Sequence, residues 1–229
     1  MRNVAIIQAR MGSSRLPGKV LKQLMGKPIL THVVTRVQAA QLIDEVVVAT
    51  STLAADDVIE EFCQQNGWHC IRGSETDVLS RYVVATLASQ ADIVIRVTSD
   101  CPLFSPLVLD AMLDQFDPAN MDYMSTNFPA RSFPVGLDCE VMRADVLLQA
   151  AEATADPYDR EHVTPYIYGN PTLFSVHGYA CDHDLQDIRI TLDTQEDYDR
   201  LIALTAAHPE LAEPEQDVLS IVQDYFQSA

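Results

Sequence analysis

The sequence predicts an α/β protein with three layers, αβα, in which helices cover both faces of a mainly parallel mixed sheet. Apolar runs rich in Val and Ile recur along the first half of the chain, and amphipathic segments of helical length separate them. This alternation is typical of strand and helix units around a parallel sheet. The 229 residues, 48% of them hydrophobic, are enough to bury a sizeable core. We therefore expect a single domain over 1–229.

The regular part of this pattern lies before residue 117. Short apolar runs with β-branched residues indicate strands, and longer amphipathic stretches indicate helices. The expected strands are 4–9, 45–50, 69–72 and 93–98, and the expected helices are 28–41, 54–66, 76–90 and 106–116.

After Phe116 the candidate elements become shorter and less regular. The expected strands there are 123–126, 139–142, 173–179 and 188–193, and the expected helices are 144–154, one that begins near Asp159, 195–208 and 214–227. No linker or low-complexity tract divides the chain. Residues 120–180 are therefore expected to form a smaller excursion of the same domain.

The overall charge excludes some classes of partner. The chain has 33 acidic residues against 15 Lys and Arg, a formal net charge of -18. Nucleic acids and anionic membranes would be repelled by this field. No stretch approaches the ~18–20 apolar residues of a membrane span, and the N-terminus lacks signal-peptide features. The five cysteines show no C-x-x-C spacing, so reduced thiols and a cytoplasmic location are expected.

The first 43 residues depart from this acidic character. They contain seven Lys and Arg and no Asp or Glu, and all three lysines of the chain are Lys19, Lys22 and Lys27. Such clustering indicates a local site for an anion. The alternative is a solvated basic face.

A glycine-bearing loop follows the first expected strand and is suited to phosphate. Glycines let the backbone approach an anion, hydroxyls and N–H groups donate to its oxygens, and Arg and Lys add positive charge. A Walker A loop is excluded, because five residues separate Gly12 from Gly18 and Val20 follows Lys19. The dinucleotide pattern G-x-G-x-x-G is absent from the sequence as well. The alternative is a surface turn of Gly, Ser and Pro residues.

Two aspartates directly follow apolar strand candidates. Asp100 follows 93–98 and Asp193 follows 188–192, so both would project from carboxyl ends of strands, where open α/β sheets bind ligands. Two carboxylates there would suit Mg²⁺ with water and phosphate oxygens. The alternatives are a turn before Pro102 and a helix cap at Asp193 or Thr194.

Five further residues are weaker candidates, each with a structural alternative. Arg81, in an expected helix, would reach a phosphate or remain solvated. Glu140 would contact a substrate or be an edge charge. Arg160 and His162 fall in the excursion, where substrate or subunit contacts are expected, although a lone His in such a place is more often structural. Arg189 would pair with a substrate carboxylate or a neighbouring acid.

The stretch IIQARMGSSRLPGKVL, residues 6–21, resembles the signature of the sugar-acid cytidylyltransferases, which include the KDO and acylneuraminate enzymes. The branch that it resembles most is that of spore-coat polysaccharide biosynthesis protein F, which carries Gln where KDO enzymes have Pro, here at Gln8. Later blocks of that branch are similar to RGSETDVLSRY, VTSDCPL, DREHVTPY and RITLDTQEDY.

The resemblance implies a nucleotidyltransferase with a GT-A-like fold that uses CTP and Mg²⁺. It implies transfer of CMP to a sugar acid with release of pyrophosphate, in the synthesis of surface polysaccharide or glycoconjugate precursors, by a homodimer joined through 120–180. Asp100 and Asp193 match the metal-binding aspartates. Catalytic roles are expected for Lys19, Arg15 and Asp100. Nucleotide contacts are expected from Gln8, Ala9, Arg10, Gly12, Ser13, Ser14, Arg15, Lys19, Ser74, Asp77 and Arg81.

Two other functions stay open from the sequence. One is a nucleotidyltransferase that uses another NTP such as GTP, or a sugar 1-phosphate, because the loop reads phosphate and not the base. The other is a nucleotide-binding module without catalysis. Gln8 and the block TSDCPL differ from the KDO-type pattern, so the base contacts stay open and KDO itself is not the expected acceptor.

Overall fold

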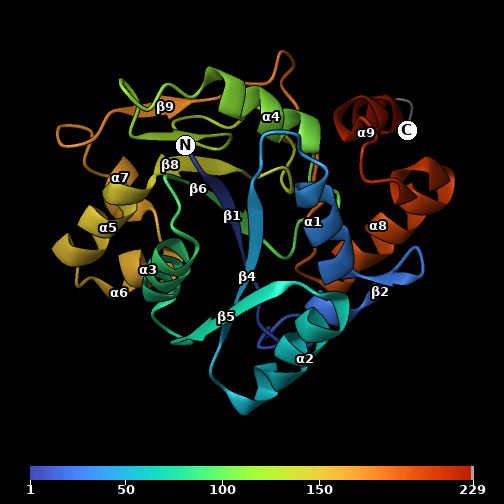
Figure 1. Cartoon of the computed structure of the whole chain (residues 1–229). Helices are drawn as coiled ribbons and strands as arrows, with labels where there is room; N and C mark the ends of the chain where they lie inside the picture. The colour runs from blue at the N-terminus through green and yellow to red at the C-terminus, as the bar shows by residue number, and fades with distance from the viewer. Residues whose placement is uncertain (228–229) are drawn as a thin grey trace.

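The computed structural model describes residues 1–227, and one seven-stranded sheet forms its centre (Figure 1). The strand order is β5-β4-β1-β6-β8-β7-β9. Four strands run parallel: β5 His69–Gly73, β4 Glu45–Ser51, β1 Asn3–Gln8 and β6 Ile93–Thr98. Next to them, β8 Glu140–Arg143 is antiparallel to both β6 and β7 Tyr123–Ser125, and β9 Val176–Gly178 is parallel to β7. The predicted mainly parallel mixed sheet is confirmed.

Helices cover both faces of this sheet (Figure 1). The alternating residues of β1 show the two faces: Ala5 and Ile7 are buried with residues of α1, α2 and α4, and Val4 and Ile6 are buried with residues of α3, α5 and α7. The helices are α1 Ile29–Gln38, α2 Asp57–Asn66, α3 Val78–Ser89, α4 Pro106–Gln115, α5 Ala144–Ala153, α6 Pro157–His162, α7 Pro165–Tyr168, α8 Gln195–Ala207 and α9 Val218–Gln227. Since a strand alternates its side chains between faces, two apolar sets require two helical layers.

Short elements connect the layers. The 3₁₀ turns are η1 Lys19–Leu21, η2 Ala54–Asp56 and η3 Pro209–Ala212, and a small hairpin pairs β2 Gln23–Leu24 with β3 Lys27–Pro28. The sequence patterns did not indicate this hairpin, because its strands are too short to show an alternation.

The expected strand at 188–193 is wrong. Within the described residues 1–227, this segment forms one isolated β-bridge, between Val135 and Arg189, and belongs to no strand of the sheet. Its apolar residues Ile190 and Leu192 pack against α8 and α9 in a third cluster, so the apolar pattern reflects burial under helices and not a place in the sheet. Leu192 N donates to the carbonyl of Asp100 (2.8 Å), which fixes the segment beside the end of β6.

Residues 120–180 contribute to the main sheet itself. Strands β7, β8 and β9 extend it beyond β6, while α5, α6 and α7 cover the face shared with α3. Within the described residues 1–227, no helix is long and apolar enough to cross a membrane.

Gly136 provides a test of how the 188–193 segment is held. Its φ is +114°, and a Cβ there would lie 2.6 Å from Thr191 N. We expect Gly136→Ala to lower the free energy of unfolding by about 2–4 kcal/mol, because backbone strain and a forced displacement add. Urea unfolding measures this.

The matched control is Gly67→Ala at the end of α2. Gly67 also has a positive φ (+69°), but a Cβ there meets nothing within 4 Å, so only the left-handed strain of about 1–2 kcal/mol is expected. Equal losses for the two variants would show that the contact with Thr191 does not matter.

Candidate active site

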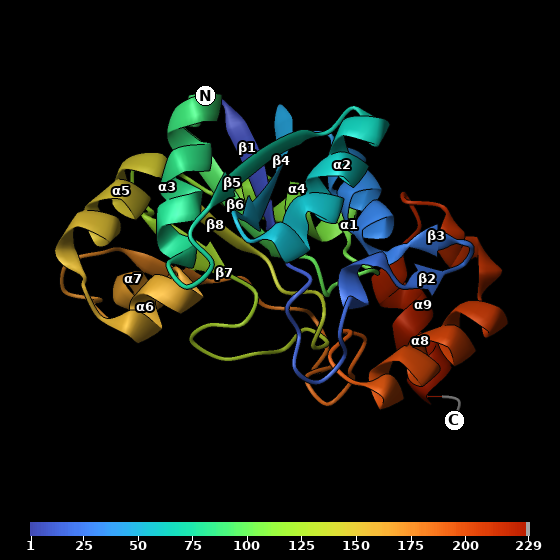
Figure 2. The same ribbon diagram turned by 90° about the horizontal axis from the view of Figure 1, so that it is seen from below.

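A pocket of about 420 Å³ opens at the carboxyl ends of β1 and β6. The loop after β1 and the segment before α8 lie at this end of the sheet (Figure 2). The predicted residues that line the pocket are Gln8, Ala9, Arg10, Gly12, Ser13, Ser14, Arg15, Lys19, Arg81, Asp100, His162 and Asp193. Its volume is in the usual range for small-molecule sites.

Backbone hydrogen bonds and one buried carboxylate hold the loop after β1 in place. Gly18, with φ +67°, donates its N–H to the carbonyl of Met11 (3.2 Å). Met11 N in turn donates to Asp56 Oδ1 (2.6 Å), and Asp56 is 2% exposed. The carboxylate also accepts from Ser51 Oγ. The loop is therefore closed at its base, which leaves the stretch from Gly12 to Arg15 facing the pocket.

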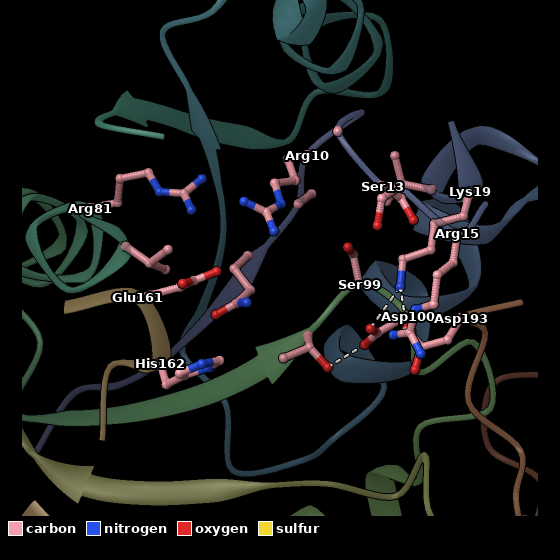
Figure 3. Close-up of a pocket in the computed structure, with 17 residues that line it drawn as sticks. Arg10, Ser13, Arg15, Lys19, Arg81, Ser99, Asp100, Glu161, His162 and Asp193 are labelled. Atoms are coloured by element: carbon pink, nitrogen blue, oxygen red, sulfur yellow. Dashed lines mark hydrogen bonds and ion pairs between the residues drawn. The ribbon is translucent and has the colours of Figure 1, made fainter. Parts of the chain in front are cut away.

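The ammonium group of Lys19 joins three separate segments (Figure 3). Lys19 Nζ donates to Asp100 Oδ2, to Asp193 Oδ1 and to the carbonyl of Leu192, each at 2.9 Å. Burial alone would lower the pKa of Lys19, but the charges and hydrogen bonds of the two aspartates outweigh it, and the pKa is raised. Residues 174 positions apart in the sequence thus meet at one charge.

Both aspartates have further partners. Thr98 Oγ1 donates to Asp100 Oδ1 (2.5 Å). Asp193 accepts from Arg189 at 2.9 Å and is paired with Arg15 at 3.2 Å. Burial would raise the pKa of Asp193, whereas the hydrogen bond and charge of Lys19 and the contacts of Arg189 and Arg15 lower it. Both carboxylates are therefore held toward the same point by cations and a hydroxyl.

The carboxylates of Asp100 and Asp193 fit a small hard cation. Mg²⁺ is usually held by one or two carboxylates, with water and substrate phosphates completing its shell. Among residues 1–227 there is no group of three or more His, Cys, Asp and Glu side chains that could hold a metal. Asp100 and Asp193 would therefore hold such an ion only together with water and substrate oxygens.

Five predicted residues lie outside the pocket lining, and two of them form an ion pair. Asp77 caps α3 by accepting from Ser80 N (2.9 Å). Arg160 binds the same carboxylate through Nε (2.9 Å) and Nη2 (2.5 Å), and its Nη1 donates to the carbonyl of Ala151 (2.7 Å). Ser74 Oγ accepts from Asp77 N (3.0 Å). Arg160 thus ties α6 to α3 and α5 and does not enter the pocket.

Arg189 is another of these residues, and Glu140 belongs to a second cavity. Arg189 binds Asp193 and Asp197. Of the two roles expected for it, the structure thus shows the pairing with neighbouring acids. Glu140 is buried, pairs with Arg96 on β6 and lines a cavity of about 320 Å³. His162 lines both this cavity and the pocket.

The pocket also contains residues that the sequence analysis missed. These are Val20, Val78, Thr98, Ser99 and Glu161. Thr98 and Ser99 directly precede Asp100 at the end of β6. They could have been predicted in the same way as Asp100, because ligands bind at the carboxyl ends of such strands. Glu161 was missed because the sequence does not show which side of the short helix α6 faces the pocket.

Comparisons with known proteins agree on one family. A family model described as "Cytidylyltransferase" matches residues 4–224. The chain is 38% identical over 207 residues to spore coat polysaccharide biosynthesis protein SpsF of Bacillus subtilis, covering 87% of this chain and 84% of that protein.

Two solved structures are similar as well. A cytidylyltransferase from Leptospira borgpetersenii has a TM-score of 0.93 and 32% identity, covering 100% of this chain and 95% of that one. A CMP-2-keto-3-deoxy-manno-octonic acid synthetase complexed with CTP has a TM-score of 0.65 and 21% identity, covering 90% and 99%. The second likeness shows the fold alone.

The pair of Asp77 and Arg160 generates a prediction about pH. Burial would raise the pKa of Asp77, but Arg160 and the α3 backbone lower it below the ordinary 3.8. Its stabilising effect is therefore complete above pH 3.8 and is lost as the pH falls through the folded-state pKa. We expect Asp77→Asn to lower the Tm at neutral pH and to differ less from the unmodified protein as the pH drops below 3.8. A difference in Tm that stays constant with pH would contradict the ionic role.

Proposed function

This chain belongs to the cytidylyltransferase family, and we propose that it transfers CMP from CTP to a hydroxyl of a sugar acid, with release of pyrophosphate. One observation carries the proposal. The glycine and serine loop after β1 faces two strand-end aspartates, and the Lys19 ammonium bridges them. Such a site combines hydrogen-bond donors for phosphate oxygens with carboxylate ligands for a divalent cation.

The relatives support the nucleotide and the pathway class. The similar structure at 21% identity was determined with CTP bound. SpsF is named for spore coat polysaccharide biosynthesis, which suggests a precursor of surface polysaccharide as the product. The sugar acid as acceptor follows from the resemblance of the loop to the sugar-acid branch of the family.

In this proposal the loop after β1 binds the triphosphate, which carries most of the charge of the nucleotide. Three to four negative charges must be held beside an anionic acceptor. The loop amides at Gly12, Ser13 and Ser14, with Arg15 and Lys19, supply donors and positive charge for the β- and γ-phosphates. To do so, Lys19 exchanges its aspartate partners for phosphate oxygens.

Asp100 and Asp193 would hold Mg²⁺, which when bound orients the phosphates and offsets the charge of the displacement. Thr98 and Arg189 hold the aspartates in place through their remaining oxygens. Both carboxylates therefore keep their orientation when Lys19 moves to the phosphates, and they are then free to hold the cation.

The reaction depends on positioning the acceptor hydroxyl near the α-phosphorus and on stabilising the negative charge that develops on the phosphates. The acceptor oxygen forms a bond to the α-phosphorus, the bond from that phosphorus to the β-phosphate oxygen breaks, pyrophosphate leaves, and the hydroxyl proton passes to solvent or a carboxylate. No covalent enzyme intermediate is required. A homodimer joined through 120–180 and a cytoplasmic location stay predictions.

The nucleotide and acceptor are tested together. We expect Mg²⁺-dependent release of pyrophosphate from CTP with a sugar acid, and little from UTP or ATP, in a coupled assay over four NTPs and a panel of sugar acids and sugar 1-phosphates. Turnover with a sugar 1-phosphate and no sugar acid would replace the proposed acceptor. Tight CTP binding without any turnover would favour a non-catalytic nucleotide-binding module.

Substitutions at the cation cluster test the mechanism. Lys19→Met and Asp100→Asn should each lower kcat by about 10²–10³, because both groups act on charge that develops in the transition state. Lys22→Met is the matched control. Lys22 lies over the ring of Tyr198 (5.0 Å) and outside the pocket lining, so its kcat should stay within about twofold of the unmodified enzyme. An Asp100→Asn enzyme with unchanged metal dependence would show that the metal assignment is wrong.

A further inference from the structure

We propose that Arg81 reads the edge of the nucleotide base and selects cytosine over uracil and adenine. This inference rests on the proposed function, since it takes the pocket to be a nucleotide site. It assigns Arg81 a role in specificity, where the sequence suggested a phosphate contact.

The guanidinium of Arg81 lines the pocket without a protein partner. Arg81 is 2% exposed, and its Nε and Nη1 have no hydrogen-bond partner among the described residues 1–227. No ion pair joins it to an acid in that part of the chain either. A buried donor without an acceptor is costly, so a bound molecule that supplies acceptors would be favoured here.

The chain makes room for this side chain at a specific place. Gly73 ends β5, and a Cβ there would lie 2.6 Å from Arg81 Cγ and 3.6 Å from its Cβ and Cδ. The stem of Arg81 therefore runs directly against a glycine, and any other residue at 73 would displace it. The position of the guanidinium depends on this contact.

Arg81 and the cation cluster occupy different ends of the pocket. Figure 3 shows Arg81 on one side and Lys19, Asp100 and Asp193 on the other, with Arg10 between. Val78, one turn before Arg81 on α3, adds an apolar side chain to the lining. Because the phosphates belong at the Lys19 end, an extended nucleotide places its base toward Arg81.

A guanidinium distinguishes bases by the pattern of acceptors. Arginine only donates, and its fork binds two adjacent acceptors. Cytosine presents O2 and N3, both acceptors, and guanine presents O6 and N7. Uracil carries a proton on N3, and adenine places an amino donor beside N7. The fork therefore accepts cytosine or guanine and rejects uracil and adenine, and the family of this chain favours cytosine.

Equilibrium binding without acceptor tests this inference separately from turnover. Titration calorimetry compares CTP, UTP, GTP, ATP and tripolyphosphate on the unmodified protein, Arg81→Lys and Gly73→Ala. Arg81→Lys keeps the charge and loses the fork. We expect the unmodified protein to bind CTP about 10-fold or more tightly than UTP. The ratio should approach one in both variants, while affinity for tripolyphosphate stays the same.

Other outcomes would overturn the inference. Equal binding of CTP and UTP by the unmodified protein excludes base reading, and so does a CTP preference that survives in Arg81→Lys and in Gly73→Ala. A loss of tripolyphosphate affinity in Arg81→Lys, of the size seen in a Lys19→Met control, would show that Arg81 contacts phosphate. Tight, cytosine-selective binding that is lost in Arg81→Lys and Gly73→Ala, without pyrophosphate release by the unmodified protein, would support Arg81 as the reader and contradict the proposed function alone.

Discussion

The candidate site depends on the attraction between one ammonium group and two carboxylates. Lys19 ends the loop after β1, Asp100 ends β6 and Asp193 precedes α8, and the three meet at distances of 2.9 Å. Two carboxylates at one point repel each other unless a cation lies between them. Lys19 provides that cation in the free protein. In the proposed function, Asp100 and Asp193 would hold Mg²⁺, whose charge would offset their repulsion while Lys19 contacts the phosphates.

This constraint explains features that are otherwise unrelated. The segment 188–193 is not a strand, yet the Leu192 bond to the Asp100 carbonyl, the bridge of Val135 to Arg189 and the close approach of Gly136 fix its path. On the other side, Asp56 holds Met11 and so closes the base of the loop. Buried hydrogen bonds thus orient the charged groups of the site. Of the seven basic residues in the first segment, Arg10, Arg15 and Lys19 line the pocket where an anion would lie.

Sequence patterns predicted the parts of this arrangement that depend on local structure. The four parallel strands follow from their apolar, β-branched runs, and the residues from Gly12 to Lys19 follow from loop chemistry. The convergence of Asp100 and Asp193 was predicted from strand ends, although Asp193 does not follow a strand. The pair of Asp77 and Arg160 could not be predicted, because it depends on how α6 packs on α3. The burial of Arg81 depends on the same kind of packing.

The most direct test of the cation exchange is a crystal structure with CTP and Mn²⁺. We predict an anomalous peak between the carboxylates of Asp100 and Asp193, and Lys19 Nζ in contact with a β- or γ-phosphate oxygen. A structure in which CTP is bound while Lys19 still bridges both aspartates, with no metal beside them, would contradict the account.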